Sequence, residues 1–429
     1  MIYLILYIVG ILAPSFLLFK RVTEWVIYFF FFFFWEFGLL RIILFKKFNL
    51  TDNDLHYLEK LIIPVKIESP QFITLLIQVM ILNLVLIIFI KKLSSLLYNL
   101  KTECLSSSYH INKHKLRFSY ISILLLSIYI IRNSLFQIIT GSITGYQAIT
   151  NFQGSGYYVH VFLNRVSLLL FLIELVNSRK KSWFLFLGIL SYSFYFLLLG
   201  QRNELFSFFI AVFIYLSIGL SLKRTKKLIV SGLLGLWILR TIEIYRSGEY
   251  DDIGPTLFID SISTLLAPLF GAESIVPFYS HYASLFIEHN SSLLFYLLWF
   301  IQSFGLINFN MQPTYVLYKS NFFAFEDRGM AINLFGSLNV LENWILATIY
   351  LPLIFFLLRR YIAFIIDYSG KYIPNIFTLA VLVYAIPSII LLGRNGLEGL
   401  RPLLYHNLGL YFIILYFFKK FLLRKLKQS

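Results

Sequence analysis

The sequence places charged side chains capable of binding phosphate at the ends of long apolar runs. The stretch LLLGQRNELFSFF, residues 197–209, interrupts apolar sequence with Arg202, Asn203 and Glu204. A guanidinium stays charged and binds phosphate oxygens through two parallel hydrogen bonds, whereas lysine offers a flexible point charge. An arginine at membrane depth costs at least about 2.5 kcal/mol, so it needs a partner or a purpose. A pyrophosphate ligand suits this chemistry.

Arginine, and not lysine, recurs at such positions along the chain. In LRTIEIYRSGEY, Arg240, Glu243 and Arg246 follow at spacings of three, which places alternating charges on one helix face. The stretch 393–402, GRNGLEGLRP, is a glycine-containing turn between apolar runs. We predict that the arginines binding pyrophosphate or glycan are Arg202, Arg240, Arg246, Arg328, Arg132, Arg394 and Arg401. An intramembrane ion pair or an ordinary polar turn is the structural alternative.

Acid and base candidates lie in the longest interval between apolar runs. FAFEDRGM places Glu326 and Asp327 directly before an arginine, and HYASLFIEHN carries His281 and His289. A general base needs reach and a suitable pKa, and all four side chain types can supply both. We predict Asp327 or Glu326 as the base, with His281 or His289 as the alternative. An acid beside an arginine is equally suited to a salt bridge.

Metal and disulfide chemistry is not indicated by the sequence. Cys104 is the only cysteine, and no HExxH motif or clustered Asp and His spacing is present. We therefore expect no cofactor and a reaction that does not depend on a metal.

The elements that must position these residues are membrane helices. The chain is 59% hydrophobic and 19% aromatic, with a mean hydropathy of +0.77. Because a bilayer core of about 30 Å requires roughly 20 helical residues, we predict an all-α polytopic membrane protein of about 11 helices, within a range of about 10–14. The predicted spans are 2–19, 22–45, 71–90, 118–138, 158–177, 182–199, 205–222, 228–247, 332–357, 375–393 and 405–418.

The distribution of basic residues predicts the topology. Most of the 37 basic residues fall in clusters on alternate loops and at the C-terminus, and the net charge is +16. By the positive-inside rule these clusters are cytoplasmic, which places the C-terminus inside and the N-terminus outside. The charge therefore predicts contact with anionic membrane lipids and no nucleic acid.

The interval 248–331 is predicted to be a large extracytoplasmic loop. It contains apolar stretches long enough for short interfacial or re-entrant helices. The sequence has no fixed-period repeat and no Pro/Gly/Ser-rich linker, so residues 1–429 are predicted to form a single polytopic membrane domain.

Three features of the chain occur together. LLLGQRNELFSFF has a glycine, a polar residue and an arginine in a turn between two spans, a long external loop precedes a late span, and NLFGSLNVLENW, residues 333–344, begins that span with Asn, Phe and Gly. Together these features resemble a known family, the Wzy-type O-antigen and capsule repeat-unit polymerases, which are relatives of the O-antigen ligases. The chain departs from the family at Asn203 and Glu204, where small residues are common.

The resemblance implies a glycosyltransferase of the bacterial inner membrane. Its substrates would be undecaprenyl-pyrophosphate-linked oligosaccharides, and the growing glycan would pass from its lipid pyrophosphate to a sugar hydroxyl of the incoming unit. A chain-length regulator and a flippase would be its protein partners. The alternatives are an O-antigen ligase and a lipid-linked oligosaccharide flippase. Transporters usually show repeated halves and broken helices at matching positions, and neither is evident in the sequence.

Overall fold

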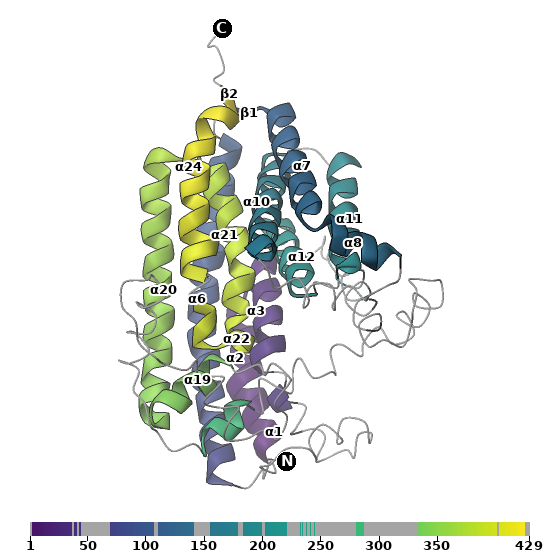
Figure 1. Cartoon of the computed structure of the whole chain (residues 1–429). Coiled ribbons are helices and arrows are strands. Elements are labelled where there is room, and N and C mark those ends of the chain that lie inside the picture. The colour runs from purple at the N-terminus through teal and green to yellow at the C-terminus, as the bar shows by residue number, and fades with distance from the viewer. Residues whose placement is uncertain are drawn as a thin grey trace, which may run out of the picture. The chain divides into compact units, whose positions relative to one another are not determined.

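The computed structural model of the chain is almost entirely helical in the parts that it describes (Figure 1). The described residues are 2–36, 38–40, 43, 69–106, 110–140, 155–178, 183–199, 202–220, 232, 234, 237, 241, 244, 280–286, 333–400 and 403–424.

Three described helices are long and apolar enough to cross a membrane. They are α6 (Pro70–Ser106), α10 (Ser155–Asn177) and α20 (Trp344–Tyr372). A fourth span results if α7 (Lys113–Ile130) and α8 (Arg132–Ile139) are counted together. The described helices thus support a membrane-associated, all-α chain. These helices support three or four spans, and the eleven spans of the sequence analysis stay a prediction.

Two predicted spans take a different form in the structure. The predicted span 332–357 is divided into α19 (Leu334–Leu341) and α20, because Glu342 takes an extended conformation and ends α19. The side chains of Asn333 and Asn343 accept hydrogen bonds from backbone amides three residues on, which starts each helix.

The predicted span 118–138 is bent in the structure. The chain bends by 75° between α7 and α8, where Ile131 leaves helical geometry. The sequence contains no proline or glycine at this point, so the usual breaker signals are absent. Within the described residues this bend is a single break, and not one of a pair at matching positions of two halves.

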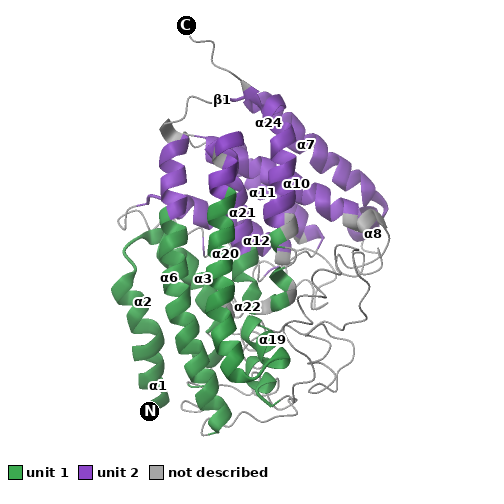
Figure 2. Cartoon of the chain, turned by 90° about the vertical axis from the view of Figure 1, so that its left-hand side faces the viewer, with its two compact units in different colours: residues 1–95, 269–365, 388–406 green, residues 96–268, 366–387, 407–429 purple. Residues whose placement is uncertain are grey.

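The chain divides into two compact units that are interleaved in sequence (Figure 2). Unit 1 comprises residues 1–95, 269–365 and 388–406. It contains α1 (Ile2–Tyr7), the π-helical segment η1 (Ile8–Leu12), α2 (Ala13–Leu18), α3 (Val22–Trp35), α19, α22 (Leu392–Asn395) and η3 (Leu397–Gly399). One core cluster of this unit includes Tyr7, Phe72, Val79 and Tyr282, so residues of the predicted loop pack against the first and third predicted spans.

Unit 2 comprises residues 96–268, 366–387 and 407–429. It contains the α7–α10 pair, α11 (Trp183–Leu198), α12 (Arg202–Ser217) and α24 (Tyr411–Leu422). A two-residue antiparallel pairing of β1 (His110–Ile111) with β2 (Leu423–Arg424) ties the C-terminal segment to the start of α7. Helices α6, α20 and α21 (Asn375–Ile390) have residues in both units, and the π-helical η4 (Leu403–Leu410) also crosses the division.

Candidate functional site

The structure describes some of the predicted site residues and leaves others outside its described part. His281 and Arg132 are described with their side chains, and Arg202 and Arg394 as helix positions only. The predicted residues outside the described part are Glu326, Asp327, His289, Arg240, Arg246, Arg328 and Arg401.

His281 is buried in a short helical turn, residues 280–284, of the predicted external loop. Its Nε2 lies 2.8 Å from Oε1 of Gln78 in α6. An amide oxygen only accepts hydrogen bonds, so Nε2 carries the hydrogen. In the neutral ring, Nδ1 is then the basic atom.

Gln78 is the centre of a buried polar network in unit 1. Its Nε2 donates to Asn339 Oδ1 at 3.1 Å and to Thr348 Oγ1 at 3.1 Å, and also lies 3.2 Å from the Trp344 carbonyl. In return, Asn339 Nδ2 donates to Gln78 Oε1 at 3.2 Å. Asn339 Nδ2 also reaches Ser284 Oγ at 3.3 Å. The network fixes the His281 turn to α6, α19 and the start of α20.

Helix α19 forms one wall of this site, and all eight of its residues are buried. The ring of Phe335 stacks on the imidazole of His281, with centroids 5.0 Å apart and planes inclined by 8°. Asn339 follows Phe335 by four residues, so both side chains are on one face of the helix. The segment 333–344 that carries the family resemblance therefore supplies both an aromatic and an amide contact to the His281 turn.

The turn 392–399 also belongs to unit 1 and contacts α19 and α3. The backbone amide of Leu397 donates to Ser337 Oγ at 3.3 Å, and Trp35 Nε1 donates to the Ile390 carbonyl at 2.9 Å. A side chain at Gly393 would begin 2.2 Å from the Trp35 indole. Glycine is therefore required here for close packing, and Arg394 follows directly at a fixed position in α22.

Burial lowers the pKa of His281 to about 3. The ring is therefore neutral at pH 7, with Nδ1 free to accept a proton. The same burial destabilises the imidazolium that proton transfer would create. This environment suits a hydrogen-bonding and positioning role better than strong base catalysis, which leaves Glu326, Asp327 and His289 as predicted bases.

An ion pair in unit 2 joins α10 to the start of α12. Arg165 Nη2 lies 2.6 Å from Glu204 Oε1, and the two side chains are 30% and 22% exposed. Glu204 is in the first turn of α12, two residues after Arg202. The sequence analysis singled out Glu204 by its place between apolar runs but gave it no partner in Arg165. Their signal was the cost of leaving either charge alone between apolar runs.

A second polar cluster of unit 2 was missed by the sequence reasoning. His160 Nδ1 lies 2.8 Å from Ser127 Oγ, and the Tyr195 hydroxyl lies 3.4 Å from the same nitrogen. His160 and Ser127 are both buried. By the predicted topology, this cluster and the Arg165–Glu204 pair both lie in the external halves of their helices.

Arg132 is at the break between α7 and α8. Its side chain is exposed and donates to the Tyr129 carbonyl at 3.1 Å, while its guanidinium lies 4.3 Å from the Tyr129 ring centroid. The guanidinium thus supplies a donor to a backbone carbonyl in the last turn of α7, where the bend interrupts the helical hydrogen bonds.

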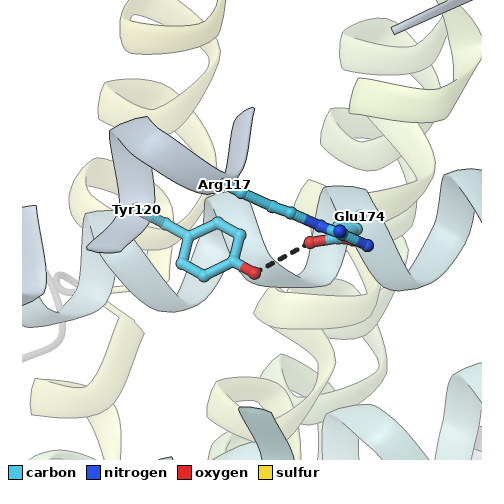
Figure 3. A network of polar contacts seen from close by, with 3 residues as sticks. All are labelled: Arg117, Tyr120 and Glu174. Carbon is cyan, nitrogen blue, oxygen red and sulfur yellow. Dashed lines mark hydrogen bonds and ion pairs between the residues drawn. The ribbon is translucent and has the colours of Figure 1, made fainter. Parts of the chain in front are cut away.

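A third cluster in unit 2 joins α7 to α10 (Figure 3). Glu174 is fully buried, and its Oε1 accepts from Arg117 Nη2 at 2.6 Å while its Oε2 accepts from the Tyr120 hydroxyl at 2.8 Å. The Arg117 guanidinium also lies 4.0 Å from the Phe184 ring centroid. These contacts compensate a buried carboxyl group and assign Arg117, which lies on the predicted cytoplasmic side, a structural role.

Within the described residues, no group of three or more His, Cys, Asp or Glu side chains is placed to hold a metal ion. Comparisons of the chain with family models, with curated proteins and with solved structures find no match.

Proposed function

We propose that this chain is a glycosyltransferase of the bacterial inner membrane that polymerises lipid-linked oligosaccharide repeat units. Its substrates are undecaprenyl-pyrophosphate-linked oligosaccharides of the O-antigen or capsule type, bound at the outer face of the membrane. The resemblance of three segments to the Wzy-type polymerases supports this proposal. The single structural observation behind it is the contact of α19 with the His281 turn, which brings two of those segments together.

The proposed reaction transfers the growing glycan between two lipid carriers. A sugar hydroxyl of the incoming unit attacks the anomeric carbon of the growing chain, and the bond from that carbon to the lipid pyrophosphate breaks. The hydroxyl proton passes to a base, for which Asp327 and Glu326 are proposed, and the lipid pyrophosphate leaves as an anion. Preorganised guanidinium groups of Arg240, Arg246 and Arg328 stabilise the developing negative charge.

A deletion experiment tests the class of reaction. Loss of a polymerase leaves single repeat units attached at the cell surface. Loss of a ligase leaves no attached units, and loss of a flippase leaves lipid-linked units on the cytoplasmic side. Single surface units in the deletion strain, returned to long chains by the plasmid-borne gene, are the result we expect.

Purified protein with lipid-linked units tests the chemistry. Glu326→Gln and Asp327→Asn should identify the base, since removing a general base costs about 10² to 10⁴ in rate. Activity abolished by a chelator and restored by a divalent ion would overturn the metal-free arginine scheme. Wild-type turnover in the double variant Glu326→Gln with Asp327→Asn would move the base to His289 or to a group of the substrate itself.

A flippase is the second candidate, because of the 75° bend between α7 and α8. Discontinuous helices are common at the substrate sites of transporters, and Arg132 lies at this break. The deletion experiment above separates this candidate from the polymerase by the side of the membrane on which units accumulate.

A further inference from the structure

Glu36 is a buried acid to which neither the family resemblance nor the proposed reaction assigns a role. It directly follows α3 in unit 1, and its side chain is fully buried. Its Oε1 has no hydrogen-bond partner, and it makes no ion pair in the described part of the chain. The two titratable groups that face it there are the hydroxyls of Tyr7 and Tyr28.

The other carboxylate oxygen of Glu36 belongs to a chain of polar contacts between α3, α6 and η1. The Tyr28 hydroxyl lies 3.2 Å from Glu36 Oε2 and 2.9 Å from Asn83 Oδ1. Asn83 Nδ2 donates to the Ile11 carbonyl at 2.7 Å, and Ser15 Oγ donates to the same carbonyl at 3.2 Å. Ile11 lies in the π-helical segment, a form that often occurs at functional sites.

The contact distances indicate which group donates at each step of this chain, with Ser15 Oγ nearer to the Ile11 carbonyl than to Asn83 Oδ1. The Ile11 carbonyl only accepts, so the amide group of Asn83 faces it and Asn83 Oδ1 must be an acceptor. The single hydrogen of Tyr28 fills that acceptor, because 2.9 Å is the shortest of the three contacts of the hydroxyl; Glu36 Oε2 lies 3.2 Å away and the Ile11 carbonyl 3.5 Å. The 3.2 Å contact between Tyr28 and Glu36 then lacks a hydrogen, unless the carboxyl group is protonated.

The surroundings of Glu36 also disfavour a charge. Glu174 is equally buried but accepts from the Arg117 guanidinium at 2.6 Å, which compensates an ionised carboxylate. Glu36 has a tyrosine hydroxyl in place of that cation. A buried carboxylate without a cationic partner is strongly disfavoured relative to its neutral acid.

We propose that Glu36 is a proton-binding site inside the membrane domain, occupied at neutral pH. Its Oε2–H donates to the Tyr28 hydroxyl, which donates to Asn83 Oδ1, and Asn83 donates to the Ile11 carbonyl. Proton release would draw the Tyr28 hydrogen to the carboxylate. Asn83 Oδ1 would then keep only Ser15 Oγ at 3.5 Å, so the site couples proton occupancy to the contact between α3 and α6.

Infrared difference spectroscopy of the full-length protein tests this proposal at neutral pH. The spectrum of the wild type minus that of Glu36→Gln should contain a protonated-carboxyl band that shifts in heavy water. A difference confined to the carboxylate region would overturn the proposal. The matched control is the spectrum of the wild type minus that of Glu174→Gln. This difference should contain carboxylate bands and no protonated-carboxyl band.

Tyr28→Phe provides a second reading that does not depend on replacing the glutamate. It removes the acceptor of the Glu36 hydrogen, so the protonated-carboxyl band should persist and move to higher frequency. An unmoved band would show that the Glu36 proton is not held by Tyr28 and would overturn the proposed chain. Each variant should elute from a size-exclusion column as one monodisperse peak at the wild-type volume before its spectrum is compared.

Discussion

At the scale of single residues, the partner of a buried ionisable group decides its chemical state. Glu174 accepts from an arginine and a tyrosine, which compensate its buried carboxyl group. Among the described residues Glu36 has only a tyrosine, and we infer a neutral acid. His281 donates to an amide oxygen and is held as a neutral imidazole. Three buried groups in an apolar chain are thus each compensated by a different means.

The first prediction concerns the pH dependence that His281 gives to stability. Its pKa is about 3 in the folded protein and about 6.5 in an unfolded chain, so the unfolded state binds the proton between these values. Stability is therefore fully present above pH 6.5 and is lost as the pH falls. Between pH 7.5 and 5.5 the loss should be about 1.4 kcal/mol. Thermal unfolding in detergent at both pH values measures it.

His281→Gln should lack this part of the pH dependence, although its stability at pH 7.5 will be lower. His114 is exposed, so His114→Gln is the matched control and should keep the wild-type slope. Equal slopes in the wild type and His281→Gln would contradict the buried neutral imidazole.

The second prediction rests on the proposed function and concerns Arg202. A guanidinium binds pyrophosphate as a fork and an ammonium does not, so Arg202→Lys should reduce long-chain polymer nearly as much as Arg202→Ala. Loss of one such donor to a developing anion costs about 10²-fold or more in rate. Polymer length on gels, at equal protein level, measures the effect.

Arg360→Lys is the control for this substitution. Arg360 lies in α20 on the predicted cytoplasmic side, with its guanidinium 5.3 Å from the Phe356 ring centroid. This variant should keep long-chain polymer. Normal polymer in Arg202→Lys would reduce Arg202 to a structural part of the turn.

At the scale of elements, the apolar runs predicted where most described helices lie but not where they end. Helix α6 continues past the predicted end at residue 90 because Leu93, Leu97 and Leu100 extend its buried stripe. Helix α19 starts at the capping side chain of Asn333, and after the break α20 starts at that of Asn343; the partners of both caps are set by the local backbone. Hydropathy does not detect such caps, since a short buried helix and the start of a span are equally apolar.

The candidate site could be predicted only in part, for a related reason. The sequence singled out His281 by its residue type. Its partner Gln78 is 203 residues away, inside an apolar run, and carries no charge. The Arg165–Glu204 contact likewise needs the packing of α10 against α12, which no local pattern specifies. Glu36 directly follows an aromatic run, residues 29–35, and no local pattern there indicates its contacts with Tyr28 and Tyr7.

The third prediction concerns this pairing of α10 with α12. Glu204→Gln leaves the Arg165 guanidinium without its carboxylate. The two side chains are 30% and 22% exposed. We therefore expect a loss between that of a surface pair and that of a buried pair, about 1–2 kcal/mol of unfolding free energy. Thermal unfolding of the purified protein measures this loss.

The exchange Arg165→Glu with Glu204→Arg restores opposite charges with their positions reversed. It should recover part of the stability that either single change removes. Additive losses in the double variant would show that the 2.6 Å contact contributes no coupling.

At the scale of the whole molecule, the described contacts restrict the topology beyond the distribution of basic residues. Gln78 is near the start of α6 and binds His281 of the predicted external loop. Lys101 lies in the same helix, 23 residues later, which corresponds to about 35 Å of helical rise. This exceeds the hydrocarbon core of about 30 Å. The His281 end and the Lys101 end of α6 are therefore predicted on opposite sides of the membrane.

The last prediction follows from that separation. Reporters fused after Lys101 and after Lys227 should both report the cytoplasm, because both positions lie in basic clusters. A reporter near Asn290, nine residues after His281, should report the exterior. Two independent arguments, the alternation of basic loops and the length of α6 between Gln78 and Lys101, require this result together. A cytoplasmic signal at Asn290 with a cytoplasmic signal at Lys101 would contradict both, and would move the proposed active face away from the leaflet where lipid-linked glycans are polymerised.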